Sequence, residues 1–451
     1  MHSLGVYWII RGDDNQNARI EVNYRQAGFA EWTKAMPLFR VEKGANRLAK
    51  GQSQVKIPAD GWLFAGSVVM LNPGTDYELQ LNLTDPDGGT ARRLLKARTK
   101  AEPTALVAAP RYHVVPGTGG GLGTANDPFR GLAAAQAKAT PGDLFLVHGG
   151  VYAGTFGATQ SGVADKPIIW RGAGDGEAVL DGQGTTGRVI DASGAHDVWF
   201  EQLSIRNAEW GLVAHNASRL VVRRCHFYQV RNGITATRND SGALGGCFIS
   251  DNLLEGPFPW PSATKGAPVK EWRGIQISGA GQEICFNRVR NFKDGIDTFP
   301  SPVCCAIDIH HNEVSECLDD GCEMDDSERN NRCFLNRFTD VFQGISVQPV
   351  HGGPVYILRN AVFNINVEPV KLHNSPSGVL VFHNTFVKRG EPFRLLTPAE
   401  VRQAVFRNNL FIGTAGAYAF ECDAQMIRCD FDYDGFGGGP WQFFLKWNRL
   451  R

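Results

Sequence analysis

The sequence predicts an all-β protein in which a long parallel β-helix, a solenoid of stacked coils, follows a small β-sandwich. Two observations carry this prediction. Between residues 4 and 100, short runs of alternating apolar and polar residues are separated by turn residues. From about residue 180 onward, one motif recurs every 24 or 25 residues, which indicates a repeat architecture. We therefore expect the sandwich at residues 1–102 and the solenoid at residues 103–451.

The composition points to a local rather than a global electrostatic function. Lys and Arg total 46, and Asp and Glu also total 46, so no overall field favours nucleic acid or an anionic membrane as a partner. No apolar run approaches the roughly 18 residues of a membrane span. The first residues lack the basic segment and apolar stretch of a signal peptide. We expect a soluble monomer.

One segment of residues 1–102 resembles a fibronectin type III domain. In LNPGTDYELQLNLTDPDGG, residues Leu71, Pro73, Gly74 and Tyr77 stand where that family has its tyrosine-corner strand. No catalytic cluster is visible in this part of the sequence. We therefore expect the module to serve as a spacer or a lid.

A short helix is expected near residues 127–139. Asn126 or Asp127 offers an N-cap, Pro128 suits the first turn, and an Ala-rich run follows. The preceding PGTGGGLGT is not a phosphate loop, because no G-K-[ST] follows it. A helix followed at once by strands resembles the start of right-handed parallel β-helix proteins, in which such a helix caps the open end of the solenoid.

Asparagines mark the repeat most clearly. They follow strand-like runs at intervals of 25, 24, 24, 24 and 24 residues, at Asn287, Asn312, Asn336, Asn360, Asn384 and Asn408. Stacked asparagine side chains can satisfy backbone groups and one another, so we interpret this ladder as structural. Asn252 belongs to the same series, and its longer interval to the next asparagine predicts a protruding loop around GPFPWPSATKGAPVKEW.

The ten cysteines show no metal-type C-x-x-C pairs, and most fall at apolar positions of the repeat. We expect most of them to be buried thiols. Cys422 and Cys429 are the best candidates for a disulfide.

A second recurring pattern gives the register of the coils. The segments WGLVAH, NGITAT, RGIQIS, DGIDTF, DGCEMD, QGISVQ, EPVKLH and EPFRLL align on one apolar residue per coil. This inward column contains Leu212, Ile234, Ile275, Ile296, Cys322, Ile345, Val370 and Phe393. The residues on either side of it point outward, and parallel strands place neighbours in one outward column about 4.7–4.9 Å apart.

The outward columns concentrate acids on two consecutive coils. The acids are Asp294, Asp297, Asp319, Asp320, Glu323 and Asp325. Lys371 lies two coils further along the same face, and its long side chain could lean back toward them. Stacked carboxylates repel unless a cation or bound protons neutralise them. Oxygen ligands without histidine or thiolate suit Ca²⁺, so we expect a calcium site. The alternative is a solvated acidic face.

The segments DGID and DDGCE resemble the calcium-dependent pectate lyases of polysaccharide lyase family nine. The resemblance implies Ca²⁺ ligands at Asp319, Asp320 and Glu323, where glutamate stands in place of the family's last aspartate. It implies an earlier ligand at Asp294 or Asp297, with neither preferred.

The region from about 110 to 440 is similar to the right-handed parallel β-helix proteins that act on polysaccharides. The resemblance implies Lys371 as the base that removes the C5 proton of a uronate in a β-elimination. Arg394, with Ca²⁺, would lower the pKa of this lysine, and His373 is the substitute base. The partner would be an acidic polysaccharide, and the protein would be secreted or periplasmic.

The remaining polar residues of this face are expected to contact substrate. These are Arg273, Gln348 and Arg359, and Trp260 of the inserted loop would offer a stacking surface for a sugar.

Two other functions remain open. Asp297 and Glu323 on adjacent coils could form the paired carboxylates of a glycoside hydrolase. The solenoid could also bind glycan without catalysis. A lyase predicts an unsaturated product that disappears with a chelator, whereas a purely binding protein predicts no product.

Overall fold

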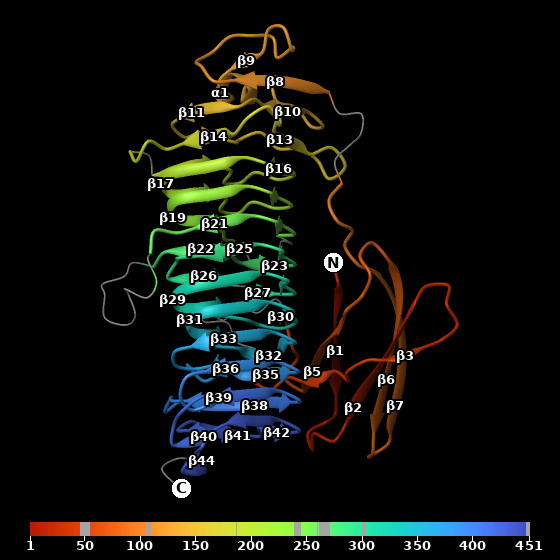
Figure 1. Ribbon diagram of the computed structural model, residues 1–451. Coiled ribbons are helices and arrows are strands. Elements are labelled where there is room, and N and C mark those ends of the chain that lie inside the picture. Colours follow the sequence, from red (N-terminus) through yellow and green to blue (C-terminus); the bar gives the residue numbers. More distant parts are fainter. Residues whose placement is uncertain are drawn as a thin grey trace.

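The structure is a computed structural model in which an elongated stack of parallel strands stands beside a smaller antiparallel domain (Figure 1). It describes residues 1–45, 55–104, 110–185, 187–238, 245–258, 260, 271–299 and 304–447. The predicted fold class is confirmed, because the described chain is built almost entirely from strands and the long stack is a parallel β-helix.

The N-terminal domain consists of two antiparallel sheets. One sheet contains, in order, β1 (Ser3–Arg11), β5 (Gly61–Val69) and β4 (Phe39–Arg40), and the other β3 (Thr33–Lys34), β2 (Arg19–Gln26), β6 (Asp76–Asp85) and β7 (Gly89–Arg98). Ile20, Phe64 and Leu81 pack in the core between them. The hydroxyl of Tyr77 accepts a hydrogen bond from the backbone N–H of Asn72 at 2.9 Å. This contact is expected of a tyrosine corner, and the resemblance to fibronectin type III stays a prediction.

Two long parallel sheets, sheet 1 and sheet 2, form the walls of the β-helix. Sheet 1 contains β8 (Arg111–Val115), β9 (Phe129–Arg130), β10 (Leu144–Val147), β13 (Ile168–Gly172), β16 (Val198–Glu201), β18 (Val221–Arg223), β20 (Phe248–Ser250), β24 (Glu283–Cys285), β28 (Asp308–His310), β30 (Asn331–Phe334), β32 (His351–Leu358), β35 (Ser377–Phe382), β38 (Glu400–Arg407), β41 (Gln425–Ile427) and β42 (Asp430–Asp432). Sheet 2 contains β11 (Gly150–Ala153), β12 (Phe156–Gly157), β14 (Ala178–Asp181), β15 (Arg188–Asp191), β17 (Ser204–Val213), β19 (His226–Ala236), β21 (Leu253–Glu255), β22 (Arg273–Ile277), β25 (Arg288–Arg290), β26 (Asp294–Asp297), β29 (Glu313–Glu323), β31 (Arg337–Ser346), β33 (Ala361–Ile365), β34 (Val370–Lys371), β36 (Thr385–Lys388), β39 (Leu410–Gly413) and β43 (Gly435–Gly438). Smaller parallel sheets pair β23 (Gly279–Ala280) with β27 (Cys304–Cys305), and β40 (Tyr418–Cys422) with both β37 (Phe393–Leu395) and β44 (Phe443–Trp447).

The predicted inward column forms the core of the β-helix on the sheet 2 side. Ile275 pairs with Ile296, Ile296 with Cys322, and Cys322 with Ile345, all fully buried. The register derived from the glycine-apolar pattern is therefore confirmed, and the next residue of each strand points out of the coil.

The capping helix is shorter and begins later than predicted. Helix α1 covers Leu132–Gln136 and begins after Gly131 without a side-chain cap. Phe129 is instead drawn into strand β9, where it pairs with Val114 and is buried. The carboxylate of Asp127 accepts a hydrogen bond from the backbone N–H of Leu122, so it holds the glycine-rich loop and does not cap the helix.

The asparagine ladder is structural, as predicted, with one correction. The side chain of Asn336 donates to the carbonyl of Ile309 at 2.9 Å and to Oδ1 of Asn360 at 3.0 Å, and the other buried members repeat this pattern. Asn409 occupies the last asparagine position of the ladder, and the predicted member, Asn408, is exposed with a φ of 56°. The coil before it is one residue longer, and two adjacent asparagines hide this shift from the sequence.

Asn336→Asp is expected to lower the free energy of unfolding by about 3 kcal/mol, because a buried carboxylate would lose both donations and face two acceptor oxygens. Thermal unfolding checks this result. Asn408→Asp is the matched control, since it makes the same change at an exposed left-handed position that aspartate tolerates. Equal melting temperatures for the two variants would show that the ladder contributes no stability.

The predicted disulfide between Cys422 and Cys429 is wrong, because both residues are free thiols. The thiol of Cys429 instead donates to the carbonyl of Val401 at 3.3 Å, and that of Cys422 to Ala424 at 3.8 Å. Among the described residues, no helix is long and apolar enough to cross a membrane.

The N-terminal domain docks on sheet 1. Ser3 donates to Asp308 of β28 at 2.5 Å, and the backbone N–H of Ser67 donates to the hydroxyl of Tyr356 of β32 at 3.0 Å. Further along, Arg402 of β38 donates to Glu42 at 3.2 Å. The domain therefore supports the coil from the side of sheet 1, whereas the acidic residues predicted to be functional lie on sheet 2.

Candidate functional site

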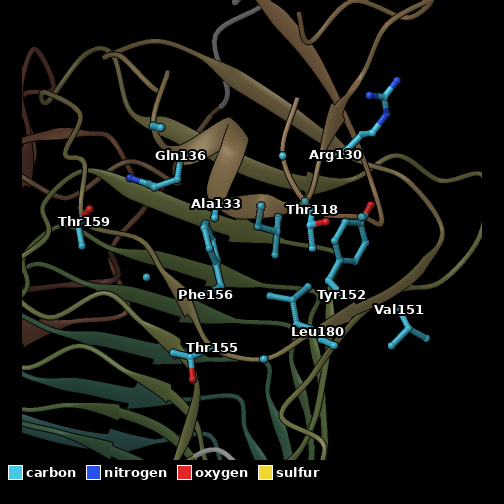
Figure 2. A pocket seen from close by; sticks show the side chains of 18 of the residues that line it. Thr118, Arg130, Ala133, Gln136, Val151, Tyr152, Thr155, Phe156, Thr159 and Leu180 are labelled. Carbon is cyan, nitrogen blue, oxygen red and sulfur yellow. The ribbon is translucent and has the colours of Figure 1, made fainter. Parts of the chain in front are cut away.

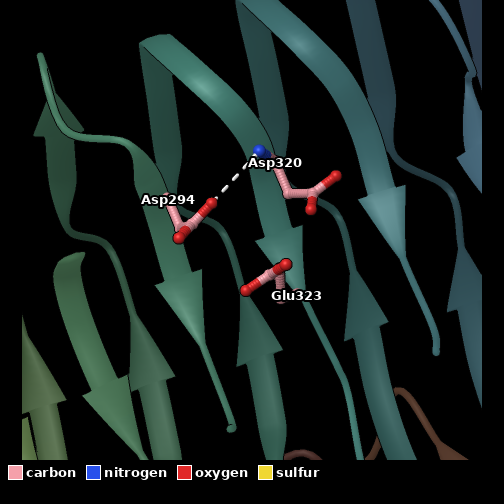
Figure 3. Close-up of side chains that lie close together, drawn as sticks. All are labelled: Asp294, Asp320 and Glu323. Carbon is pink, nitrogen blue, oxygen red and sulfur yellow. Dashed lines mark hydrogen bonds between the residues drawn. The ribbon is translucent and has the colours of Figure 1, made fainter. Parts of the chain in front are cut away.

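Three carboxylates from two consecutive coils converge on sheet 2. Asp294 begins β26, while Asp320 and Glu323 lie at the end of β29 (Figure 3). Their ligand oxygens all lie within 4.8 Å of one another. The backbone N–H of Asp320 donates to Oδ1 of Asp294 at 3.4 Å. We name these three residues the acid cluster.

The register of the strands produces this convergence. Ile296 pairs with Cys322 in the inward column, and the next residue of each strand forms the outward pair of Asp297 and Glu323. Gly295 allows the two coils to approach, because a Cβ there would lie 2.6 Å from the carbonyl oxygen of Gly321. The predicted grouping of acids on adjacent coils is thus present in the structure.

The acid cluster is buried, which corrects the expectation of an acidic patch on the outer surface. Asp294 and Asp320 are 0% exposed and Glu323 is 8% exposed. The side chains point out of the coil, and long side chains of the same face, such as Lys371 and Arg273, lie against them. A solvated acidic face therefore does not describe this site, and the carboxylates need neutralising partners inside the protein.

Lys371 supplies one of these partners. Its Nζ lies 2.8 Å from Oδ2 of Asp320, although the two residues are 51 positions apart. The predicted reach of this lysine back across two coils is therefore observed. Lys293 lies 3.7 Å from Oδ2 of Asp294, but that oxygen is buried and has no hydrogen-bond partner among the described residues.

Burial raises the pKa values of the acid cluster. The pKa of Asp294 is raised well above its usual value by burial and then by Glu323. Burial also raises the pKa of Asp320 to about 7, and burial with the nearby Asp320 raises that of Glu323 to about 10. Burial alone would lower the pKa of Lys371, but Asp320 raises it above its usual value. Near neutral pH the lysine is therefore charged, and protons neutralise part of the acid cluster.

Comparison with known proteins bears on the fold around this site. A family model described as "Right handed beta helix region" matches residues 183–361, which include the acid cluster. The solenoid is a right-handed parallel β-helix. No curated protein matches the chain.

Several solved structures resemble this β-helix. The complex of XylC with xylose is 12% identical over 67% of this chain and 76% of that chain, with a TM-score of 0.48. Pectate lyase Pel9A is 18% identical over 72% and 78%, with a TM-score of 0.46. The Family 28 exopolygalacturonase of Yersinia enterocolitica is 12% identical over 97% of both chains, with a TM-score of 0.43.

Asp297 lies beside the acid cluster but is already engaged. It forms an ion pair with Arg273, and its Oδ1 accepts the backbone N–H of Phe299 at 2.5 Å. Gln276 donates to its other oxygen at 3.3 Å. The sequence left the choice between Asp294 and Asp297 open, and in the β-helix Asp294 is the one that joins the cluster.

The other two predicted acids flank the cluster. Asp325 accepts a hydrogen bond from the hydroxyl of Ser346 at 3.1 Å and from the backbone N–H of Gln348 at 2.9 Å. Asp319 is partly exposed and lies 3.6 Å from Lys293. Both acids are held by local contacts of the β-helix.

His373 and Arg394 belong to a neighbouring group of charges on sheet 2 and β37. Nε2 of His373 lies 3.0 Å from Oε2 of Glu368, and Nε of Arg394 donates to Glu421 at 3.0 Å. Among the described residues, neither His373 nor Arg394 forms a hydrogen bond or an ion pair with Lys371. Their predicted roles beside this lysine stay predictions.

Two further predicted residues lie outside this group. Arg359 is exposed at the turn before β33, and the whole of β33 separates it from Lys371 in the coil. Trp260 is half-buried in a loop whose positions 259 and 261–270 lie outside the described residues. Their contacts with a substrate stay predictions.

Lys388 is a buried cation that the sequence did not reveal. It is 2% exposed, its Nζ donates to the carbonyl of Val367 at 2.6 Å, and burial together with Arg394 lowers its pKa to about 8. It ends β36 in register with Ile365, at a position where other coils carry apolar residues. A register shift between Phe363 and Ile365 brings Lys388 to this position, and counting along the sequence does not reveal the shift.

Proposed function

We propose that the protein is a lyase that cleaves an acidic, uronate-containing polysaccharide by calcium-assisted β-elimination. One observation supports this function above the others. The buried acid cluster gathers three carboxylates within 4.8 Å and lies directly against the amine of Lys371. A polymer of this kind occurs outside the cell, so we also propose a secreted or periplasmic location.

The residues of the acid cluster fit Ca²⁺. All three offer carboxylate oxygens, which are hard ligands, and no histidine or cysteine belongs to the group. The buried Oδ2 of Asp294 has no hydrogen-bond partner among the described residues, and Lys293 approaches it only to 3.7 Å, so this oxygen could ligate the ion. Asp294, Asp320 and Glu323 would hold the ion. When bound, Ca²⁺ would neutralise a substrate carboxylate and stabilise the negative charge that develops beside it.

Lys371 is the residue placed to move the proton. In a β-elimination the C5–H bond breaks, its electron pair forms the C4–C5 double bond, and the C4–O bond breaks as the leaving oxygen departs with its electrons. Asp320 holds the pKa of Lys371 above its usual value, against the expected lowering, so the lysine would act as the base only at alkaline pH or after a bound cation has displaced its proton. The neutral Lys371 would then accept the C5 proton at Nζ. The hydrogen bond to Asp320 orients this nitrogen, since a neutral amine can donate one N–H there and keep its lone pair free.

The paired-carboxylate alternative is less well supported. Asp297 and Glu323 are in register on adjacent strands, as that function requires. However, Arg273 and the backbone of Phe299 already engage the oxygens of Asp297, so this carboxylate is not free to act as a nucleophile or to activate water.

The proposed function predicts that the protein forms an unsaturated, ultraviolet-absorbing product from at least one of pectate, alginate and a glycosaminoglycan. The product should appear with Ca²⁺, disappear with a chelator and return when Ca²⁺ is restored. Neutral xylan is the control substrate and should give no product. Absorbance and reducing-end assays run in parallel on the same samples make this measurement.

The two assays separate the alternatives. New reducing ends without ultraviolet absorbance would mean hydrolysis, and the lyase proposal would fall. Retention of an acidic polymer without any product would leave a binding protein in its place.

A further inference from the structure

Trp210 presents an aromatic ring to solvent on sheet 2, the sheet that carries the acid cluster. It lies in β17 and is 36% exposed, more than any other tryptophan of the described chain. Its backbone N–H donates to the carbonyl of Gly187 at 3.0 Å, so the coil fixes the base of the side chain. Single exposed apolar side chains are common on protein surfaces, so the position of this ring decides whether it has a function.

Trp210 stands in the same column as Asp294 of the acid cluster. It pairs with Asn232 on the next coil, and Oδ1 of Asn232 accepts the backbone N–H of Arg273 at 3.2 Å. Arg273 in turn pairs with Asp294. These three strand steps correspond to roughly 14 Å. The ring therefore lies on the face of the acid cluster, three coils closer to the N-terminal end of the β-helix.

This distance suits a polysaccharide that lies along sheet 2. An extended chain of linked pyranoses advances by about one strand spacing per sugar, so the coils and the sugars keep step over a short distance. A chain bound at the acid cluster would then place a sugar about three residues away over Trp210. The C–H face of a pyranose packs well on an exposed aromatic ring.

Arg188 adds a positive charge beside this ring. It is in register with Trp210 on the adjacent coil, and its side chain is 42% exposed. Its Nη1 donates to Oδ2 of Asp191 at 2.9 Å, the one hydrogen bond of this guanidinium to a described residue. A guanidinium has five N–H donors and can pair with a second carboxylate. An aromatic ring next to an exposed guanidinium fits a sugar that carries a carboxylate.

One coil beyond Arg188 lies a cavity of about 680 Å³, next to helix α1 (Figure 2). Thr155 lines this cavity, and its hydroxyl donates to the carbonyl of Arg188 at 2.8 Å. The aromatic residues of the lining, Tyr152 and Phe156, are both buried. They offer no exposed ring, so on the described part of this end of sheet 2 Trp210 is the aromatic surface that a sugar can reach.

We propose that Trp210 is the platform for a uronate residue bound three coils away from the acid cluster, with Arg188 as the partner of its carboxylate. The identity of the ligand rests on the proposed function, whereas the exposure of the ring and its place in the column do not. Only a long chain reaches both the acid cluster and Trp210, so the protein would bind long oligomers more tightly than short ones.

Oligomers of two lengths test the proposal. Isothermal titration is carried out with Ca²⁺ on Lys371→Gln, which lacks the proposed base and leaves the ligand uncut. The ligands are the hexamers and trimers of galacturonate and of mannuronate, and the uronate whose hexamer binds more tightly is used further. Adding Trp210→Ala is expected to weaken hexamer binding about tenfold and trimer binding less than about twofold. Trp210→Phe keeps a ring and should retain most of the affinity.

Two further variants separate charge and non-specific effects. Arg188→Gln should weaken binding of the hexamer about tenfold and leave that of the trimer unchanged. Tyr433→Ala is the matched control, because it removes an aromatic ring that is 77% exposed near the C-terminal end of the β-helix. It should leave binding of both oligomers unchanged. Circular dichroism confirms that each variant is folded.

Three results would overturn the proposal: no binding of either hexamer, unchanged hexamer binding in Trp210→Ala, or equal weakening of hexamer and trimer. The outcome is distinct from that of the proposed function, because binding is measured without cleavage. Trp210-dependent binding of the hexamer in a protein that forms no unsaturated product would remove only the proposed function. Formation of that product by the wild type, with hexamer binding unchanged in Trp210→Ala, would remove only this inference.

Discussion

Lys371→Gln is expected to lower kcat on the acidic polysaccharide by about a hundredfold to ten-thousandfold, the usual contribution of a positioned general base. Glutamine keeps a polar group near Asp320 but cannot accept a proton from carbon. The reason lies in the geometry, since Nζ of Lys371 is 2.8 Å from Oδ2 of Asp320 and directly beside the acid cluster. Initial rates of product formation at saturating Ca²⁺ measure the change.

A matched lysine controls for the loss of positive charge. Lys293 lies 3.7 Å from Asp294 but pairs with Glu271 at the edge of the site, so Lys293→Gln should change the rate less than about tenfold. The pH profile gives a second readout. Because Asp320 raises the pKa of Lys371, wild-type activity should rise toward alkaline pH, and the residual activity of Lys371→Gln should not. Full activity in Lys371→Gln would exclude this lysine as the base.

In a chelator, the protein is expected to lose stability as the pH rises from about 5 to 8. The folded state raises the pKa of Asp325 to about 6, that of Asp320 to about 7 and that of Glu323 to about 10, chiefly by burial. A raised carboxyl pKa means that the folded state binds more protons than the unfolded state. The stabilising contribution of each such carboxyl group is complete below its pKa of about 4 in the unfolded state. It is lost as the pH rises through the pKa of that group in the folded state.

Thermal unfolding at several pH values measures this loss, and we expect the melting temperature to fall by roughly 5 °C or more across this range. Added Ca²⁺ should restore most of the fall at pH 8, because a bound cation replaces the protons. Glu323→Gln removes one titrating group and should flatten the profile in chelator, whereas Asp165→Asn, at an exposed acid of another coil, should not. A wild-type melting temperature independent of both pH and Ca²⁺ would mean that the acid cluster carries no net charge to neutralise.

The sequence predicts the register of the site because strand periodicity depends only on neighbouring residues. The alternation that places Ile296 and Cys322 inward also places Asp297 and Glu323 together outward. The acids also contact long side chains of other coils, such as Lys371 and Arg273, and no local pattern predicts these contacts or the burial of the site. For this reason the acid cluster was expected at the surface and is found inside.

Side-chain reach explains the remaining differences at the site. The columns place Arg273 beside Asp294, and the backbones do pair in this register. The guanidinium nevertheless extends along the strand and pairs with Asp297, while it stays 4.0 Å from Asp294, which joins the cluster. Which of two neighbouring partners a long side chain contacts depends on the folded structure. The sequence alone therefore does not decide between Asp294 and Asp297.

The docking of the N-terminal domain on sheet 1 has a consequence for how the protein unfolds. Coils of a solenoid normally contact only their neighbours, so a stretch of coils can open while the rest stays intact. Here Ser3, Tyr356 and Arg402 tie one folded domain to β28, β32 and β38, which belong to well-separated coils. Because one domain contacts several coils, these coils and the acid cluster beside them should unfold together as one cooperative unit.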